Sequence, residues 1–179
     1  WMEEIANAVT HGIGAALSIA ALIIMLYTVL TDHEGIWHIL SATVYGISLI
    51  LLYVMSTLYH SFFKLPRVAH VFKILDHSAI YVLIAGSYTP FLWIALRYSS
   101  GLAASAMIWL LAAVGIVWQC FNVHKFHIVS TLCYVAMGWI SVLFLPQLMH
   151  SLSWNAMLWL IIGGLSYTIG TVFYLWKRL

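Results

Sequence analysis

Residues 12–30 read GIGAALSIAALIIMLYTVL and carry no charged side chain. Because a helix rises about 1.5 Å per residue, a run of this length crosses the roughly 30 Å hydrocarbon core of a bilayer. Five more apolar stretches of similar length follow along the chain. The six predicted spans are residues 5–30, 37–62, 74–96, 102–122, 128–145 and 154–176, the first beginning at Ile5 or at the latest at Gly12.

The composition indicates that the bilayer is the solvent for the whole chain. Of the 179 residues, 64% are apolar and only 7% are charged, whereas an ordinary soluble domain carries about 25% charged residues. Backbone groups in lipid must pair internally, and apolar runs without two-residue alternation favour helices over a closed barrel. The connectors are too short for a separate soluble domain. We therefore predict one transmembrane domain over residues 1–179, an all-α integral membrane helical bundle.

Charge and cysteine content exclude two further classes of protein. The formal net charge is +2 and the bases are scattered, so the sequence gives no basic patch for nucleic acid. The two cysteines lie inside apolar stretches and exclude a disulfide framework. Membrane lipids are the expected partners, and the oligomeric state stays open.

The basic residues predict the orientation of the spans, because short cytoplasmic loops carry an excess of Lys and Arg. Arg97 is the one base assigned to the opposite side of the membrane. The N-terminus is therefore predicted to be cytoplasmic. The bases assigned to the N-terminal side are Lys64, Arg67, Lys73, Lys125, Lys177 and Arg178.

Polar and ionisable residues gather at the predicted cytoplasmic ends of the first three spans. Within the first span, spacings of three and four residues put the polar side chains on one helical face. Charge or imidazole in a span is costly, so such residues are functional candidates. They are Glu4, Asn7 and His11 in the first span, Ser56 and His60 in the second, and Asp76 in the third.

Two readings of these residues stand side by side. Imidazoles with a carboxylate are ligands that Zn²⁺ takes, and a catalytic zinc holds three protein ligands and a water. Polar residues at helix edges also serve as interfacial or hydrogen-bonded groups. The residues alone leave both readings open, because His60, His11 and Asp76 are few for a complete site.

The ordered motifs resemble the hemolysin III branch of the progestin and adipoQ receptor family. The resemblance covers essentially the whole chain and includes Ala136–Trp139 and the segment from Phe173 to Arg178. Its main motifs are Glu4-x-x-Asn7-x-x-x-His11, then Ser56-x-x-x-His60, then Asp76 followed by AIYVLIAGSYTPF at residues 79–91. It implies a protein of the bacterial plasma membrane with seven helices and a zinc near the cytoplasmic face, bound by three histidines.

The resemblance also implies roles for individual residues. His60 corresponds to the zinc ligand of the second span, Asp76 to a carboxylate that acts through a water, and Ser56 to the motif serine. Glu4, Asn7 and His11 form a supporting motif. The catalytic candidates are thus Asp76 and Ser56.

The remaining zinc ligands implied by the resemblance lie outside this sequence. They come from an His-x-x-x-His motif on the seventh helix, and the sequence ends at Leu179. We therefore expect six of seven helices, an incomplete zinc site, and two further histidines after Leu179. His124 and His127 are not a replacement, because their spacing is three and they lie in a predicted loop.

Three functions follow as hypotheses. The first is a zinc-dependent hydrolase, similar to ceramidases, that cleaves a lipid amide or ester in membrane lipid homeostasis. The second is a non-enzymatic, receptor-like membrane regulator in which zinc is structural. The third is a hemolysin that permeabilises membranes, which six apolar helices with short loops favour least.

Overall fold

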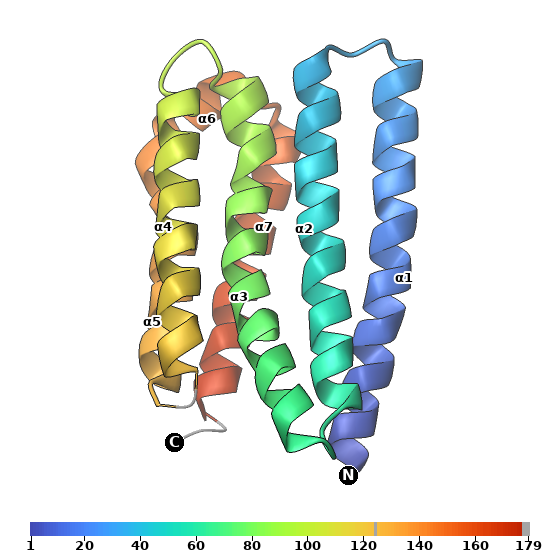
Figure 1. Cartoon of the computed structure of the whole chain (residues 1–179). Coiled ribbons are helices and arrows are strands. Elements are labelled where there is room, and N and C mark those ends of the chain that lie inside the picture. The colour runs from blue at the N-terminus through green and yellow to red at the C-terminus, as the bar shows by residue number, and fades with distance from the viewer. Residues whose placement is uncertain (124, 177–179) are drawn as a thin grey trace.

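The chain forms a bundle of helices that run up and down along one axis (Figure 1). The computed structural model describes residues 1–123 and 125–176. In these ranges, six helical stretches are long and apolar enough to cross a membrane, as predicted. The helices are α1 (Met2–Thr31), α2 (Ile36–Ser61), α3 (Pro66–Pro90), α4 (Gly101–Asn122), α5 (His127–Trp139), α6 (Leu145–Ser151) and α7 (Trp154–Trp176).

Two of the stretches extend beyond their predicted ends. The third begins at Pro66 rather than at residue 74, because proline has the right φ angle for a first helical turn and its missing N–H costs nothing there. The fifth was predicted to end at residue 145 but runs through a 3₁₀ segment, η2 (Ile140–Phe144), into α6 and ends at Ser151. Pro146 lies in the first turn of α6, where it is tolerated for the same reason.

Pro90 marks a change of helix type. It lacks a backbone N–H and cannot complete the regular α-helical ladder. The chain continues from α3 directly into a π-helix, η1 (Phe91–Ala95), before turning into α4. Wider turns of this kind re-satisfy backbone groups next to a proline inside a membrane helix.

Small residues let the first three helices approach closely. A Cβ atom added at Gly46 would overlap Leu22 of α1, and one added at Gly86 would overlap Ser48 of α2. Close backbone approach at small residues is how membrane helices gain packing energy without a hydrophobic driving force. These two contacts join α2 to α1 and to α3.

The buried core lies between α3, α4 and α5, whereas α1 and α7 expose most of their apolar side chains. Tyr81 and Ala85 of α3 and Leu92 of η1 pack with Ile108 of α4 in this core. Long exposed apolar helices fit a protein whose outer surface contacts lipid. The beginnings of α1, α3 and α5 lie at the same end of the bundle as the ends of α2, α4 and α7 (Figure 1); we call it the N-terminal end.

Candidate functional site

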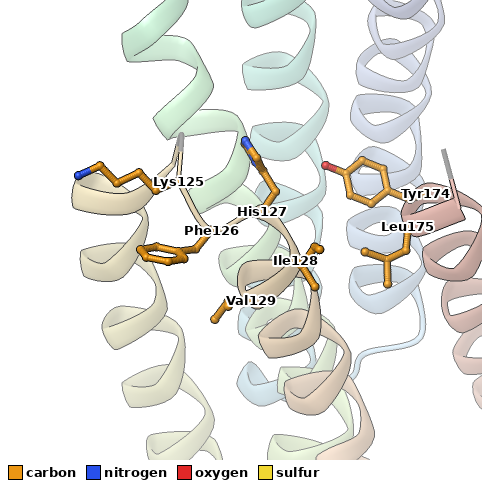
Figure 2. Close-up of a pocket in the computed structure, with 7 residues that line it drawn as sticks. All are labelled: Lys125, Phe126, His127, Ile128, Val129, Tyr174 and Leu175. Carbon is orange, nitrogen blue, oxygen red and sulfur yellow. The ribbon is translucent and has the colours of Figure 1, made fainter. Parts of the chain in front are cut away.

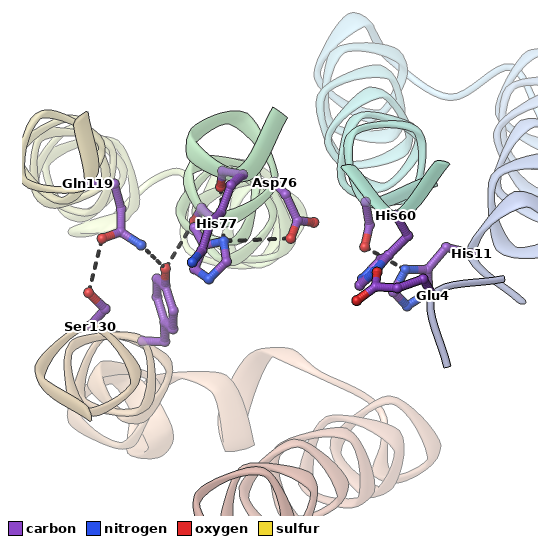
Figure 3. A network of polar contacts seen from close by, with 10 residues as sticks. Glu4, His11, His60, Asp76, His77, Gln119 and Ser130 are labelled. Atoms are coloured by element: carbon purple, nitrogen blue, oxygen red, sulfur yellow. Dashed lines mark hydrogen bonds and ion pairs between the residues drawn. The ribbon is translucent and has the colours of Figure 1, made fainter. Parts of the chain in front are cut away.

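A carboxylate and an imidazole pair across two helices at the N-terminal end. Glu4 lies in the first turn of α1 and His60 in the last turn of α2. The antiparallel packing of these helices brings Glu4 Oε2 to 2.6 Å from His60 Nδ1 (Figure 3). His60 is mostly buried, with 16% of its side chain exposed. The contact engages Nδ1 and leaves Nε2 as the ring nitrogen for another partner.

A second contact joins the same helices deeper in the bundle. His11 Nδ1 and Ser56 Oγ are 2.5 Å apart, and Ser56 is buried. The His11 and His60 rings have centroids 5.8 Å apart. The two contacts therefore form one continuous polar seam between α1 and α2. Asn7 is exposed and does not join this seam through its side chain in any contact described for it; its backbone carbonyl accepts a hydrogen bond from Thr10.

Asp76 brings a third helix to the seam. Its carboxylate lies on the side of α3 that faces α2 (Figure 3), and it interacts electrostatically with Ser56 and His60. On its own helix, Asp76 Oδ2 is 3.6 Å from His77 Nδ1, and that nitrogen is 2.9 Å from the Lys73 carbonyl oxygen. The structure thus brings together five of the six predicted site residues.

A neutral polar network lies on the other side of α3. Ser130 Oγ donates to Gln119 Oε1 at 3.0 Å, and Gln119 Nε2 donates to the Tyr134 hydroxyl at 2.7 Å. That hydroxyl donates to the backbone carbonyl of His77 at 3.0 Å. Gln119 has no exposed surface. The sequence analysis missed this network, although a lone amide inside an apolar run is a signal that could have marked Gln119.

The seam fits one zinc ligand with its supporting group. A histidine that binds zinc commonly donates its other ring N–H to a carboxylate, which fixes the ring and raises its basicity; Glu4 and His60 have that arrangement. Over residues 1–123 and 125–176, however, no three His, Cys, Asp or Glu side chains lie close enough to hold a metal. His124, Lys177 and Arg178, which entered the predictions, lie outside the described residues.

His127 lies beside a separate pocket of about 480 Å³ at the same end of the bundle. Figure 2 shows the Tyr174 ring pointing from α7 toward His127 at the start of α5, with Lys125 directed away from both. The His127 ring is 6.4 Å from the His77 ring between centroids. The pocket is therefore adjacent to the Asp76 region without being part of the seam.

A larger apolar pocket of about 730 Å³ lies between α2, α3, α5 and α7. Leu83, Phe91 and Trp159 contribute apolar wall, and the hydroxyl groups of Ser87 and Tyr88 are among the few polar groups there. Pockets of this volume accommodate ligands of several hundred daltons. The bundle thus holds apolar space next to helices that also carry the seam.

Comparison with known proteins places these features in a family. The sequence profile described as haemolysin-III related matches residues 1–179. The chain belongs to the haemolysin-III-related family. It is 49% identical to "Hemolysin-3" of Bacillus cereus over 177 residues, which are 99% of this chain and 80% of that protein. To the "Hemolysin-3 homolog" of Bacillus subtilis (strain 168) it is 44% identical, over 99% of this chain and 82% of the relative.

A more distant relative extends the comparison beyond bacteria. The human "Monocyte to macrophage differentiation factor" is 32% identical over 180 aligned residues, which cover 96% of this chain and 71% of that protein. The family relationship predicted from the ordered motifs is confirmed. The haemolysin-III-related chain is an integral membrane protein with a helical fold.

Proposed function

We propose that this protein is a zinc-dependent hydrolase that cleaves an amide or ester bond of a membrane lipid at the cytoplasmic leaflet, as part of membrane lipid homeostasis. In this proposal the protein resides in the bacterial plasma membrane with its N-terminus in the cytoplasm. The observation that carries the proposal is the Glu4–His60 pair, 2.6 Å between Oε2 and Nδ1, next to the Asp76 carboxylate.

His60, Glu4 and Asp76 would form one part of a zinc site, and further ligands would complete it. His60 would bind through Nε2 because Glu4 engages Nδ1. We assign the other two ligands to histidines after Leu179, as the family resemblance implies. Bound zinc would act as a Lewis acid toward the lipid carbonyl.

The residues of this chain then have distinct tasks. The Asp76 carboxylate accepts the proton of the attacking water and returns it to the leaving group, as a general base and acid. Ser56 lies between His11 and Asp76, and its hydroxyl oxygen would accept a hydrogen bond from the attacking water. Glu4 keeps the His60 ring in one orientation.

The apolar pocket supports a lipid as the substrate. Its wall is mostly apolar, and it lies between helices that also carry the site, α2 and α3. A substrate that arrives through the bilayer suits a site with its ionisable residues at one end of a membrane bundle.

The test compares His60→Ala with His38→Ala in the full-length protein purified from membranes. His38 also contacts a carboxylate, Glu34, at 3.4 Å, but at the opposite end of the bundle. We expect His60→Ala to lose bound zinc and hydrolysis of a ceramide-type lipid amide, and His38→Ala to retain both. Retention of stoichiometric zinc and hydrolysis by His60→Ala would rule the proposal out.

A structural role for zinc is the second candidate. The observation favouring it is that Glu4–His60 and His11–Ser56 both tie α1 to α2, as a clasp would. Metal binding of that kind contributes to folding and has no chemical step. Removal of zinc would then lower the melting temperature of a protein that shows no turnover in its zinc-loaded form.

Membrane permeabilisation is the third candidate, favoured by the names of the two Bacillus relatives. Its test is the addition of purified protein to intact cells without detergent. Lysis at low protein concentration would support it, whereas a requirement for detergent would count against it.

A further inference from the structure

The buried polar network ends beside Asp76, at the backbone of the next residue. Tyr134 of α5 donates to the His77 carbonyl oxygen at 3.0 Å and receives the amide of Gln119 from α4 at 2.7 Å. Ser130 donates to the other end of the Gln119 amide. Each of these three groups donates to the next, so the hydrogen bonds all run in one direction, from Ser130 to the backbone of α3.

The network is fully buried within the bundle. Gln119 is 0% exposed, and Ser130 and Tyr134 are buried as well. Burying an amide and two hydroxyl groups in a membrane protein is costly unless all are paired. Paired hydrogen bonds in a low-dielectric interior strengthen one another. The arrangement therefore gives a stiff connection from α4 and α5 to one turn of α3.

That turn of α3 lies between two polar systems. Gln119 and Ser130 lie on one side of the helix, and Asp76 points from the other side toward His60 (Figure 3). A rotation or shift of α3 that moves the Asp76 carboxylate would also break the bond from Tyr134 to the carbonyl of residue 77. The network resists that movement.

We infer that Tyr134, held by Gln119 and Ser130, is a positioning residue that fixes the rotation of α3 and so places the Asp76 carboxylate against the α1–α2 seam. This inference rests on the proposed hydrolase function for its catalytic consequence. Its structural part, the fixed turn of α3, can be measured without turnover. A displacement of about 1 Å at a reacting group lowers rates by up to roughly 100-fold.

The test uses Tyr134→Phe with Thr89→Val as the control. Phenylalanine at 134 keeps the ring that packs against Tyr81, at 4.6 Å between centroids. The Thr89 hydroxyl also ties α3 to a neighbouring helix, because it accepts a hydrogen bond from Trp109 Nε1 of α4 at 3.3 Å. Thr89 lies thirteen residues beyond Asp76, or about 20 Å along a helix. A general loss of helix contacts would affect both variants.

The first readout is kinetic. In the full-length, zinc-loaded protein we expect Tyr134→Phe to lower kcat about tenfold with unchanged KM and zinc content, and Thr89→Val to stay within twofold of the parent. In an Asp76→Asn background, Tyr134→Phe should have no further effect on kcat, because it acts through Asp76. An unchanged kcat in Tyr134→Phe, or an equal loss in Thr89→Val, overturns the inference.

The second readout is hydrogen exchange in the metal-free protein. The amide of residue 81 pairs with the His77 carbonyl in the helix, so Tyr134→Phe should raise exchange about tenfold over residues 73–82, and Thr89→Val should not. If the parent protein hydrolyses no lipid, the proposed function fails and exchange alone decides the inference. Faster exchange confined to Tyr134→Phe then supports it, and equal exchange in all three proteins overturns it.

Discussion

Two carboxylate–histidine pairs lie at opposite ends of the bundle, and they differ in how the chain forms them. Glu34 and His38 are four residues apart at the start of α2, with Oε2 and Nδ1 separated by 3.4 Å. Glu4 and His60 come from different helices, and the corresponding atoms are 2.6 Å apart. The short segment where the chain enters α2 forms the first pair, with Glu34 two residues before the helix and His38 in its first turn, whereas only the folded α1–α2 hairpin forms the second.

The difference shows why the same two residue types suit different tasks. Exposed pairs four residues apart contribute about 0.2–0.5 kcal/mol and are readily lost to solvent. The Glu4–His60 pair has Ser56 and Asp76 as neighbours and orients a ring that is mostly buried. In the proposed site, an oriented imidazole next to a carboxylate can bind a metal. Among the contacts described for it, the Glu34–His38 pair has no second carboxylate or hydroxyl group as a neighbour.

The largest expected effect that separates the two pairs is on zinc affinity. Glu4→Ala removes the carboxylate that orients His60, and loss of such a supporting group typically costs 10–100-fold in metal affinity. We expect a decrease of that size, measured by competition with a chelator in the full-length protein.

Glu34→Ala is the matched control at the other end. It removes the partner of His38 and should leave zinc affinity within about twofold of the parent, with a change in unfolding free energy of at most about 0.5 kcal/mol. Equal zinc affinities in Glu4→Ala and Glu34→Ala would show that the two pairs do not differ in function.

A smaller effect is expected from Ser56→Ala. The variant removes the partner of His11 from the seam, and one hydrogen bond is worth about 1 kcal/mol net. Turnover should fall about fivefold with zinc retained. The control is Thr57→Ala, whose hydroxyl bonds only to the carbonyl of Tyr53 in its own helix among the described contacts. A larger loss in Thr57→Ala than in Ser56→Ala would contradict this assignment.

The sequence predicted the helices well because hydropathy over twenty residues is a strong signal. Helix ends were less certain: Pro66 begins a helix that extends the third span by two turns, since apolar character ends before helical structure does. The shared depth of Glu4, His60 and Asp76 was predictable from charge and topology. Which atoms pair was not, because that depends on the rotation of each helix.

The residues that sequence reasoning missed lack any periodic signal. Gln119 and Tyr134 are single polar residues in apolar runs, and their partners come from other helices. Asn7 is the opposite case, a residue that the sequence predicted for the site and the structure leaves outside it. Its spacing placed it with Glu4 and His11, but it is exposed. Spacing on one helix thus predicts a shared face but not which neighbour that face meets.

We propose that His60 holds the metal while Asp76 moves the proton, and zinc content and turnover measured together in Asp76→Asn test this division of roles directly. The substitution keeps the size of the side chain and removes its basicity. We expect Asp76→Asn to bind as much zinc as the parent protein. Its rate of hydrolysis should be lower by roughly 100- to 10,000-fold. Hydrolysis at the parental rate by Asp76→Asn with zinc bound would contradict it.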